Sequence, residues 1–523
     1  MFRNNLLYIM MMISIFFAVL FFNPNLQWNC WDTYEYINLG KSLEQGTGFR
    51  KIWYPGEPLG SRLPFFYPYL LSLLMKLSEN IIFLKCFSLG CYIVNTFLVY
   101  YLYQRIFKLP DVIVFVLALT FSLNSITLNL SHIILSETLF LLLVLTSFIF
   151  TMNYVKHDRN VNVYLFLASF SMIFAWQIRS LGLAIILAIF LYLFIEKRFS
   201  RLSFLLMCTS LISIIFLSFS TTFAGSEFSF ENYGYFSSLM YQLSEPQLIA
   251  QSIYKGFFNY FHVIPTSIFG FIYDIIAHFN FHMLIVFKIL MFLFSLIVMI
   301  MITVGYINLF SSYRLSCLFV GIYLTSLIFW PYFQSSPTIR FIFPVLPFLL
   351  IYFYNGLRLS MEKFEGIFKD KIIYNLTLSI CIVILISNSS AMLYRALVLE
   401  KNIYVFNKKG ESSYPTEWKN YFNGLMWLEK NILDKSIILT RDSSLCFLIT
   451  GHKSVSIEWT QSANDIMRLI KENNVDYVIA NPYYKGNIEK FLFSAIRQNP
   501  NDYFQVYGIH EDSVRIFKII KTS

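Results

Sequence analysis

The sequence predicts a polytopic α-helical membrane protein with about eleven transmembrane helices, which ends in a small C-terminal α/β soluble domain. Three observations predict this fold class. Of the 523 residues, 57% are hydrophobic and 13% are charged, whereas an average soluble domain has about 25% charged residues. Apolar runs long enough to cross a bilayer recur up to residue 390. Beyond that point, strand-like and helix-like patterns alternate, as they do in α/β domains.

The apolar runs set the number of predicted spans, because a spanning helix needs about 20 residues. They cover residues 6–22, 81–103, 111–130, 133–155, 161–178, 180–195, 202–219, 281–307, 315–333, 341–357 and 372–390. The segment 254–276 is either a further span or a re-entrant element. No small-residue cleavage site follows the first run, so we expect that run to be retained as a span.

The distribution of Lys and Arg predicts the orientation. The net charge is +10, and much of it lies in alternate short loops, which is the topology signal of a membrane protein. We therefore expect no nucleic-acid partner. The basic loops contain Arg105 and Lys108, Lys156 and Arg159, Lys197 to Arg201, Arg314, and Arg358 to Lys371. With these loops in the cytoplasm, an odd span count places the tail outside. The predicted location is the bacterial inner (plasma) membrane, with the active site and the tail extracytoplasmic.

This topology divides the chain into two predicted domains. Residues 1–390 form a transmembrane domain with two long outer loops, 23–80 and 220–280, and residues 391–523 form the extracytoplasmic α/β domain. In the tail, the patterns predict strands at 436–440 and 475–480. One helix is predicted to start at the capping box Ser462–Asp465, and a second helix to cover 488–496. A hairpin of 504–509 and 514–520 is predicted to close the domain. The tail has no glycine-rich phosphate loop and no evident nucleophile.

The first outer loop has the most informative pattern. Asp32 lies just past the first span, and Glu35 and Tyr36 follow it within about one helical turn. The loop ends in an Arg-x-Pro-x-x-x-Pro sequence that starts at Arg62 and includes Tyr67. Polar groups at the outer ends of spans are typical of functional sites in membrane proteins.

In these residues the chain resembles the C-type membrane glycosyltransferases, which include protein O-mannosyltransferases and lipid A aminoarabinose transferases. The resemblance covers nearly the whole chain. It is carried by Asp32-x-x-x-Tyr36, Arg62-Leu-Pro64-Phe-Phe-Tyr67-Pro68, Ser136-Glu137-Thr138-Leu139-Phe140, Arg179-Ser-Leu-Gly182, Arg340-Phe-Ile-Phe-Pro344-Val-Leu-Pro347, and the tail strand Val475-Asp-Tyr-Val-Ile-Ala480.

The resemblance implies an enzyme that moves a sugar from a polyprenyl-phosphate carrier to an acceptor hydroxyl on the outer face of the membrane. The expected partners are this donor, an acceptor glycan, lipid or protein, and membrane lipids. Asp32 matches the catalytic acid of the family and is the predicted general base. The sequence departs from members with an adjacent Asp-Glu pair, since two residues separate Asp32 from Glu35.

The leaving phosphate requires cations, and arginine fits phosphate oxygens with two parallel donors. Arg62 is the first candidate, with Arg179 and Arg340 as further ones. Tyr36 and Tyr67 are predicted substrate contacts. His132 and Glu137 are predicted to hold the acceptor, or a divalent metal ion together with a loop carboxylate such as Glu35.

Each of these residues also has a plainer interpretation. Asp32 is alternatively a helix N-cap, with Glu35 closing a capping box. Arg62, Arg179 and Arg340 are alternatively snorkelling cations at span ends. Glu137 is alternatively a structural partner of His132 or Arg179, because a carboxylate there needs a partner.

Three other functions remain open at this point. A transporter or flippase of lipid-linked glycans typically shows internal repeats and helices broken at the midplane, and the sequence shows no repeat. A polysaccharide polymerase or ligase takes a lipid-linked oligosaccharide, and its first loop would not carry the acidic motif. A membrane scaffold would leave Asp32 and Arg62 together without an explanation.

Overall fold

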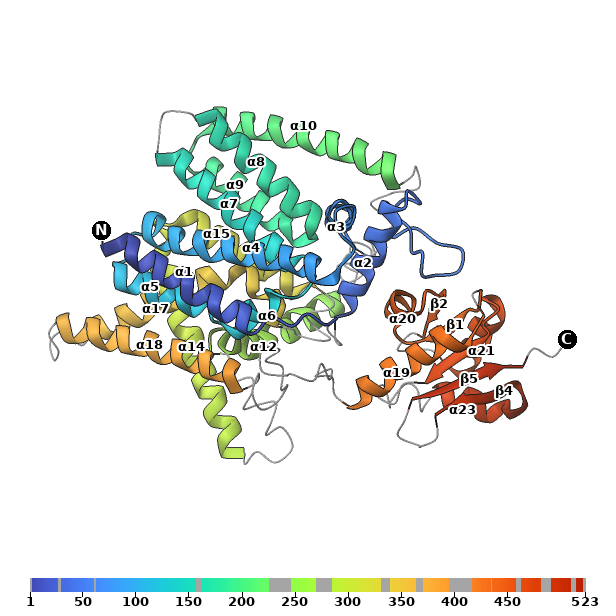
Figure 1. Cartoon of the computed structure of the whole chain (residues 1–523). Coiled ribbons are helices and arrows are strands. Elements are labelled where there is room, and N and C mark those ends of the chain that lie inside the picture. Colours follow the sequence, from blue (N-terminus) through green and yellow to red (C-terminus); the bar gives the residue numbers. More distant parts are fainter. Residues whose placement is uncertain are drawn as a thin grey trace. The chain divides into compact units, whose positions relative to one another are not determined.

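A computed structural model of the chain describes most of its residues (Figure 1). The described ranges are 2–26, 30–60, 63–156, 161–224, 246–269, 285–330, 339–363, 370–394, 416–433, 435–457, 462–480, 491–508 and 514–520. The chain forms two compact units. Unit 1 comprises Met1–Pro24, Ile82–Phe219 and Ser229–Lys408, and unit 2 comprises Asn25–Ile81, Ser220–Phe228 and Lys409–Ser523. The division at residue 390 stays a prediction, since these units are defined by contacts rather than chain order.

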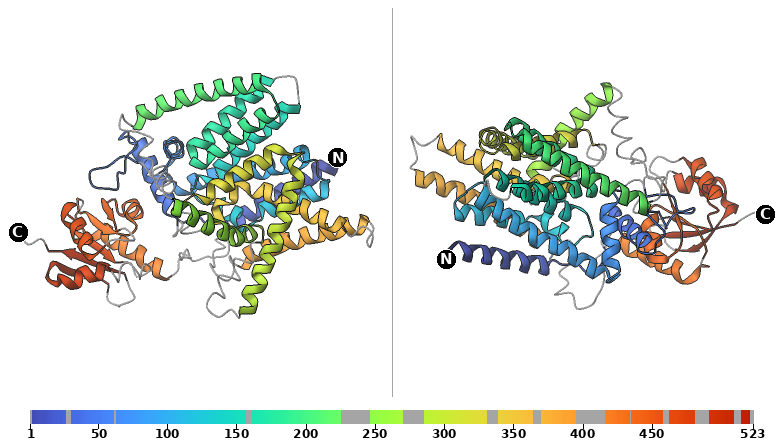
Figure 2. Two further views of the ribbon diagram at one scale, coloured as in Figure 1. Left: turned by 180° about the vertical axis from the view of Figure 1, so that it is seen from behind. Right: turned by 90° about the horizontal axis from the view of Figure 1, so that it is seen from above.

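Unit 1 is helical, and every predicted apolar run contains a helix (Figure 2). Its α-helices are α1 (Phe2–Leu20), α4 (Ile81–Tyr101), α5 (Asp111–Ser122), α6 (Ser125–Leu130), α7 (Glu137–Lys156), α8 (Val161–Ile178), α9 (Leu183–Ile195), α10 (Phe199–Ala224), α12 (Pro246–Ile268), α14 (Ile285–Phe310), α15 (Arg314–Ile328), α17 (Leu346–Glu362) and α18 (Asp370–Tyr394). Within the described part of the chain, five helical segments are long and apolar enough to cross a membrane, and several apolar helices are shorter. The chain is a helical integral membrane protein, and the count of eleven spans stays a prediction.

The predicted run 111–130 is interrupted in the structure. α5 ends at Ser122, and the Asn124 side chain accepts a hydrogen bond from the Ile126 backbone at 3.0 Å, which caps the start of α6. Asparagine is among the best N-cap residues because its side-chain oxygen satisfies an otherwise unpaired helix amide. The Asn124 amide group also donates to the Ser267 carbonyl at 2.7 Å, which ties this break to the end of α12.

α17 forms the centre of unit 1, and all its residues from Leu346 to Leu357 are buried. Its neighbour α14 presents most of its surface to the outside of the unit. The two helices touch through a pair of glycines. An added Cβ on Gly305 would overlap the Tyr352 carbonyl, and one on Gly356 would overlap the Met301 carbonyl. Small residues allow such backbone approach in membrane helices, where packing replaces the hydrophobic effect as the driving force.

The glycine crossing gives a first prediction. Gly356→Ala is expected to destabilise unit 1 by about 1–3 kcal/mol or more, because the added methyl group forces apart two backbones that are in contact. Gly90→Ala on α4 is the matched control, since no atom lies within 4 Å of its added Cβ. Thermal unfolding in detergent measures both variants. Equal unfolding midpoints for the two would contradict the close crossing.

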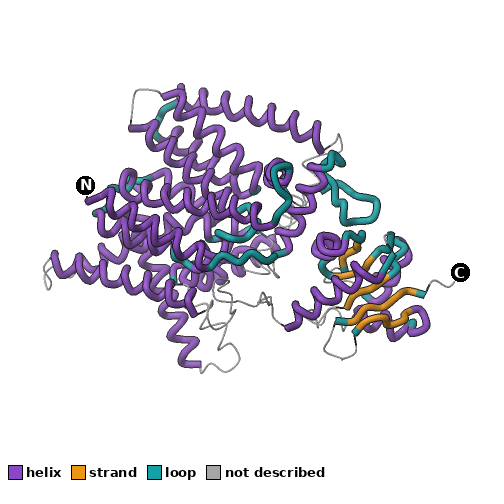
Figure 3. The backbone as a smooth tube through the Cα atoms, in the orientation of Figure 1, coloured by secondary structure: helices purple, strands orange, loops and turns teal. Residues whose placement is uncertain are grey.

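Unit 2 contains a five-stranded sheet with helices on both faces (Figure 3). The strands are β1 (Ile438–Thr440), β2 (Ser454–Ser456), β3 (Tyr477–Ala480), β4 (Tyr503–Tyr507) and β5 (Arg515–Ile519), in the order β2-β1-β3-β5-β4. β1 pairs in parallel with β2 and β3, whereas β5 pairs antiparallel with β3 and β4. The helices are α2 (Trp31–Glu44), α3 (Phe66–Met75), α19 (Thr416–Asn431), α20 (Ser443–Thr450), α21 (Ala463–Glu472) and α23 (Phe493–Gln498).

Alternation along the strands separates the two hydrophobic faces of this sheet, since successive strand residues point to opposite sides. Leu439 and Val478 face one cluster, which α21 and α23 cover. Ile438 and Ile479 face the other cluster, which α19 and α20 cover. The predicted strands, capping box and antiparallel hairpin are present, while α19, α20 and β2 were not predicted. Residues 488–490 of the predicted helix 488–496, and residues 509–513 at the turn of the predicted hairpin, lie outside the described residues.

The first loop folds onto the tail within unit 2. Tyr34 of α2 is 2% exposed and belongs to the same cluster as Trp418 and Tyr421 of α19. The Ser454 amide donates to the Trp53 carbonyl at 2.7 Å, so the start of β2 is bonded to the loop backbone. Lys453 and Glu57 form an ion pair at 2.8 Å. Loop and tail thus share one core, although more than 300 residues of sequence separate them.

Candidate functional site

Asp32 lies in the first turn of α2, one turn before Glu35, and both side chains are half-buried. The N-cap of α2 is Cys30, and no side chain caps the helix. The interpretation of Asp32 as an N-cap with Glu35 closing a capping box is therefore wrong. A helix N-terminus carries partial positive charge that stabilises a carboxylate beside it. Residues three apart on a helix lie on one face, so the two carboxylates are neighbours.

The remaining first-loop residues have different outcomes. Arg62 lies outside the described residues, so its assignment to the carrier phosphate stays a prediction. Tyr36 and Tyr67 contact each other with ring centroids 4.7 Å apart in an edge-to-face arrangement. Their exposures are 4% and 0%. Such burial gives both rings a packing role between α2 and α3.

In unit 1, three charged residues from three separate motifs meet. Arg179 Nη1 lies 2.6 Å from Glu137 Oε1, and Arg340 Nε lies 3.7 Å from the same oxygen. Glu137 is 1% exposed. Both guanidinium groups also lie over the Phe341 ring: the distance from the guanidinium carbon to the ring centroid is 5.9 Å for Arg179 and 5.4 Å for Arg340. The ion pair of Glu137 with Arg179, which the sequence left as an alternative, is present.

The local backbone explains how these side chains converge. Glu137 opens α7, which is tied to α4 by the Asn95 amide donating to the Thr138 carbonyl at 2.8 Å. Arg179 follows the last residue of α8 in extended conformation, and its Nη1 donates to Ser136 Oγ at 3.3 Å. Arg340 lies in a 3₁₀ turn, Ile339–Phe341, whose Phe341 carbonyl accepts a hydrogen bond from the Tyr323 hydroxyl.

The charges of this cluster do not cancel. Glu137 contributes −1 and the two arginines contribute +2, so the three groups sum to +1. The carboxylate is buried, whereas Arg179 and Arg340 have side-chain exposures of 15% and 31%. The accessible part of the cluster is therefore cationic. A partly desolvated pair of guanidinium groups is suited to bind an anion such as a phosphate.

His132 lies in the turn between α6 and α7 and is 6% exposed. Burial, and secondarily the positive charge of Lys85, lower the pKa of His132 from 6.5 to about 3. The imidazole is therefore neutral at physiological pH and does not form an ion pair with Glu137. Its hydrogen-bond partners include Ser131 Oγ, at 3.5 Å, and the backbone of Leu128.

Lys85 is the charged residue that sequence reasoning missed. It lies on α4, is 2% exposed, and donates to the Asn23 carbonyl at 2.8 Å. This bond ties the chain after α1 to α4. The signal was present in the sequence, because a lysine inside an apolar run requires a partner.

Gly182 gives a prediction about this site. The turn after α8 folds back so closely that a Cβ on Gly182 would lie 2.5 Å from the Trp176 amide nitrogen. Gly182→Ala is expected to displace Arg179, whose carbonyl accepts a hydrogen bond from the Gly182 amide at 2.8 Å. The sugar transfer that the motif resemblance implies should then fall by about 10²-fold, the scale of a 1 Å misplacement. Steady-state kinetics with Gly90→Ala as control measures this. Wild-type rates for Gly182→Ala would contradict it.

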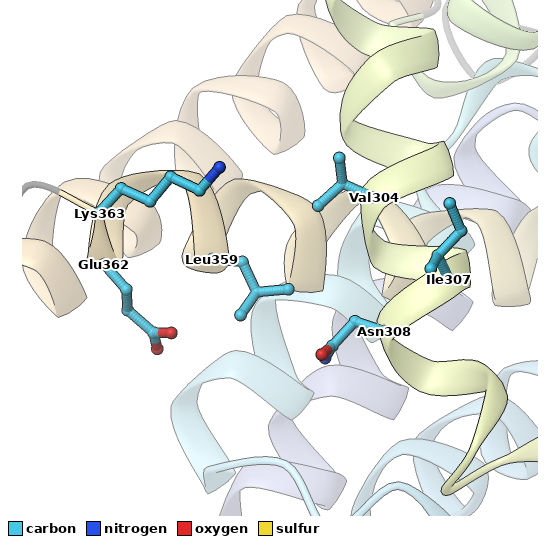
Figure 4. Close-up of a pocket in the computed structure, with 6 residues that line it drawn as sticks. All are labelled: Val304, Ile307, Asn308, Leu359, Glu362 and Lys363. Atoms are coloured by element: carbon cyan, nitrogen blue, oxygen red, sulfur yellow. The ribbon is translucent and has the colours of Figure 1, made fainter.

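A groove of about 560 Å³ lies elsewhere in unit 1, between α14 and α17 (Figure 4). It is lined by Val304, Ile307, Asn308, Leu359, Glu362 and Lys363. None of these is a predicted site residue, so the groove does not change the assignment. In the described part of the chain, no three His, Cys, Asp or Glu side chains form a group suited to a metal ion. Glu137 faces two guanidinium groups, and their positive charge disfavours a metal cation at this carboxylate.

Comparison with known proteins gives matches among solved structures only: no family model and no curated protein sequence matches the chain. The oligosaccharyltransferase of Archaeoglobus fulgidus, in complex with Zn and sulfate, matches with a TM-score of 0.57 and 13% identity, over 97% of this chain and 72% of that one. The same type of enzyme, AglB, in complex with an inhibitory peptide and a dolichol-phosphate, matches with a TM-score of 0.56 and 12% identity, over 96% and 72%.

A third match is to ArnT from Cupriavidus metallidurans bound to undecaprenyl phosphate. Its TM-score is 0.51 and its identity is 10%, over 98% of this chain and 97% of that one. Likeness at this level of identity concerns the fold. The chain therefore has the fold of the C-type membrane glycosyltransferases, the superfamily that its sequence motifs resemble.

Proposed function

We propose that the chain is a membrane glycosyltransferase that moves a sugar from a polyprenyl-phosphate carrier to an acceptor hydroxyl. One observation carries the proposal. Glu137, Arg179 and Arg340 come from three motifs that are distant in sequence, and they form one cluster with a surplus positive charge. A cationic cluster suits the phosphate of a lipid carrier. The fold supports the same choice, because similar structures were solved with dolichol-phosphate and undecaprenyl phosphate.

In the proposed reaction, the Asp32 carboxylate accepts the proton of the acceptor hydroxyl. The hydroxyl oxygen then forms a bond to the anomeric carbon of the sugar, while the bond from that carbon to the carrier phosphate oxygen breaks. The carrier phosphate leaves with the bonding electrons. The motif resemblance assigns the stabilisation of its charge to arginines such as Arg179 and Arg340, because fixed cations stabilise an anionic leaving group. Arg62 is proposed as a further phosphate ligand.

The cluster also gives Glu137 a role in the proposed reaction. Two arginines held close together repel each other, and a buried carboxylate between them offsets this repulsion. The net charge of +1 then remains for the phosphate. Glu137 in this proposal orients the two guanidinium groups rather than contacting the sugar.

The proposed orientation places the reaction on the outer face of a bacterial plasma membrane. The basis is the positive-inside distribution of Lys and Arg in the short loops. A reporter enzyme fused after Ser523 is expected to be active only on the extracytoplasmic side. Activity on the cytoplasmic side would overturn this topology.

The direct test uses the purified chain with a panel of polyprenyl-phosphate hexoses and pentoses and the membrane glycan fraction as acceptor. Release of polyprenyl phosphate, together with label transfer to the acceptor, is expected. In proteoliposomes, a flippase would move the donor between leaflets without consuming it. Translocation with an intact donor would therefore replace the proposed function by transport.

A further inference from the structure

α2 contacts the tail through one continuous helical face. The Arg441 guanidinium lies 5.1 Å from the centroid of the Trp31 ring. Tyr34, three residues on, is buried in the cluster of α19 and α20. Asn38, four residues further, is fully buried, and its amide donates to the Ser444 carbonyl at 2.8 Å. Positions i, i+3 and i+7 share one face of a helix, so the tail holds α2 along two turns.

Asp32 lies next to this face rather than on it. It follows Trp31 directly, which places its side chain about 100° further around the helix axis. Asp32 and Glu35 are half-buried, while Tyr34 and Asn38 are buried. The contact with the tail therefore fixes the rotation of α2 about its axis, and this rotation determines the direction in which the Asp32 carboxylate points.

The tail makes this contact with the residues that follow β1. The chain runs from β1 to β2 on one side and then to β3 on the other side of β1. In open parallel sheets, the crevice at the carboxyl ends of the strands where the order reverses is the usual ligand position. Arg441 to Ser444 lie at the carboxyl end of β1, and here they contact Trp31 and Asn38. The tail thus uses this position to hold a segment of its own chain.

Arg441 is itself fixed for this role. It is 8% exposed, and its Nη1 donates to the Ile457 carbonyl, which directly follows β2. The guanidinium group is thus hydrogen-bonded to the residue after β2 and lies over the ring of Trp31. A planar guanidinium stacks on an aromatic face, which a lysine ammonium does not do in the same way.

From this arrangement we propose that Arg441 is a positioning residue, which sets the orientation of Asp32 through its contact with the Trp31 ring. The inference rests on the proposed function only for its catalytic consequence. Its structural part is independent of any substrate: loss of the Arg441 side chain loosens the first turn of α2.

Variants of the full-length protein test the proposal. Arg441→Ala removes the contact, and Arg441→Lys keeps the charge without the planar group, in case the alanine variant does not fold. Trp31→Phe keeps an aromatic face. Lys453→Met is the matched control, because it removes a cation from the same contact between tail and loop but in a half-exposed ion pair with Glu57, which contributes little.

Hydrogen exchange of the peptide covering α2 is the first measurement. Faster exchange in its first turn is expected for Arg441→Ala and Arg441→Lys, and unchanged exchange for Lys453→Met and Trp31→Phe. Unchanged exchange in both Arg441 variants, with the fold intact, would overturn the proposal. This result does not depend on turnover, so it separates failure of this inference from failure of the proposed function.

The kinetic measurement addresses the consequence for the reaction. Arg441→Ala is expected to lower kcat by about 10²-fold, the scale of a 1 Å misplacement, with KM for the donor unchanged. Adding Trp31→Ala should cause no further loss, because both substitutions remove the same contact. A raised KM with normal kcat, or additive losses in the double variant, would instead assign Arg441 a role other than positioning Asp32.

Discussion

Asp32→Asn is expected to abolish most sugar transfer, with a loss of about 10²–10⁴-fold in kcat, which is the usual contribution of a general base. The amide has the size and shape of the carboxylate and still fits the first turn of α2, so the fold is retained. It cannot accept the proton of the acceptor hydroxyl. Donor KM should change little, because in the proposed reaction Asp32 contacts the acceptor and the donor phosphate is held by arginines.

The helix itself offers controls for this prediction. Glu44→Gln makes the same chemical change at the last residue of α2, and wild-type kinetics are expected. Glu35→Gln decides whether the second carboxylate takes part: a loss as large as that of Asp32→Asn would make the two a functional pair. Transfer by Asp32→Asn at the wild-type rate would exclude Asp32 as the base, and the donor-release assay measures all three variants.

The helical part of the fold could be predicted from the sequence because its signal is local. Each apolar run of the length of a span contains a helix, and the residues that cap a helix or form a turn lie within a few positions of one another. The capping box of Ser462 and Asp465 is an example: it was predicted from four consecutive residues and is present in the structure. The break at Asn124 was missed because hydrophobicity continues across it, and only the capping geometry reveals it.

The association of the first loop with the tail could not be predicted in the same way. The bond from Asn38 to Ser444 joins positions 406 residues apart, and nothing near either residue specifies the other. The sequence singled out the acidic pattern of Asp32 and Glu35, but it gave no reason to place Tyr34 in the core of the tail. The first loop and the tail are parts of one folded unit.

For the candidate site, the sequence supplied residue types and the structure supplied partners. Glu137, Arg179 and Arg340 were each selected for a charge at a span end, where an ionisable group requires compensation. Their mutual contacts depend on how α7, the turn after α8 and the turn before α17 converge, which periodicity does not encode. Lys85 shows the reverse case, since its charge was visible in the sequence and only its partner Asn23 explains it.

Glu137→Gln is expected to lower the stability of unit 1 strongly. Removing one partner of a buried ion pair typically costs about 3–5 kcal/mol, because the other charge is left uncompensated. We expect the lower part of this range, since Arg179 and Arg340 are 15% and 31% exposed and water screens part of the charge. The unfolding midpoint in detergent should fall accordingly.

A second ion pair of unit 1 provides the comparison. Arg314 and Glu196 lie 2.8 Å apart, but both are about one third exposed. Glu196→Gln is therefore expected to cost at most about 1 kcal/mol, although its distance is close to the 2.6 Å between Arg179 and Glu137. Similar losses in the two variants would show that burial does not determine the contribution of Glu137.

The contribution of the cluster to stability and its proposed binding of the donor phosphate can be separated by substituting different residues. Arg340 is the more exposed and more distant cation, so Arg340→Gln should cost less stability than Glu137→Gln and should raise the KM for the donor. The double variant Glu137→Gln/Arg179→Met should lose less stability than the two single variants added together. The reason is that Arg179→Met removes the guanidinium charge that Glu137→Gln leaves uncompensated. A cluster that only braces the helices would show the same stability coupling with an unchanged donor KM, so the KM of Arg340→Gln decides whether these arginines bind phosphate.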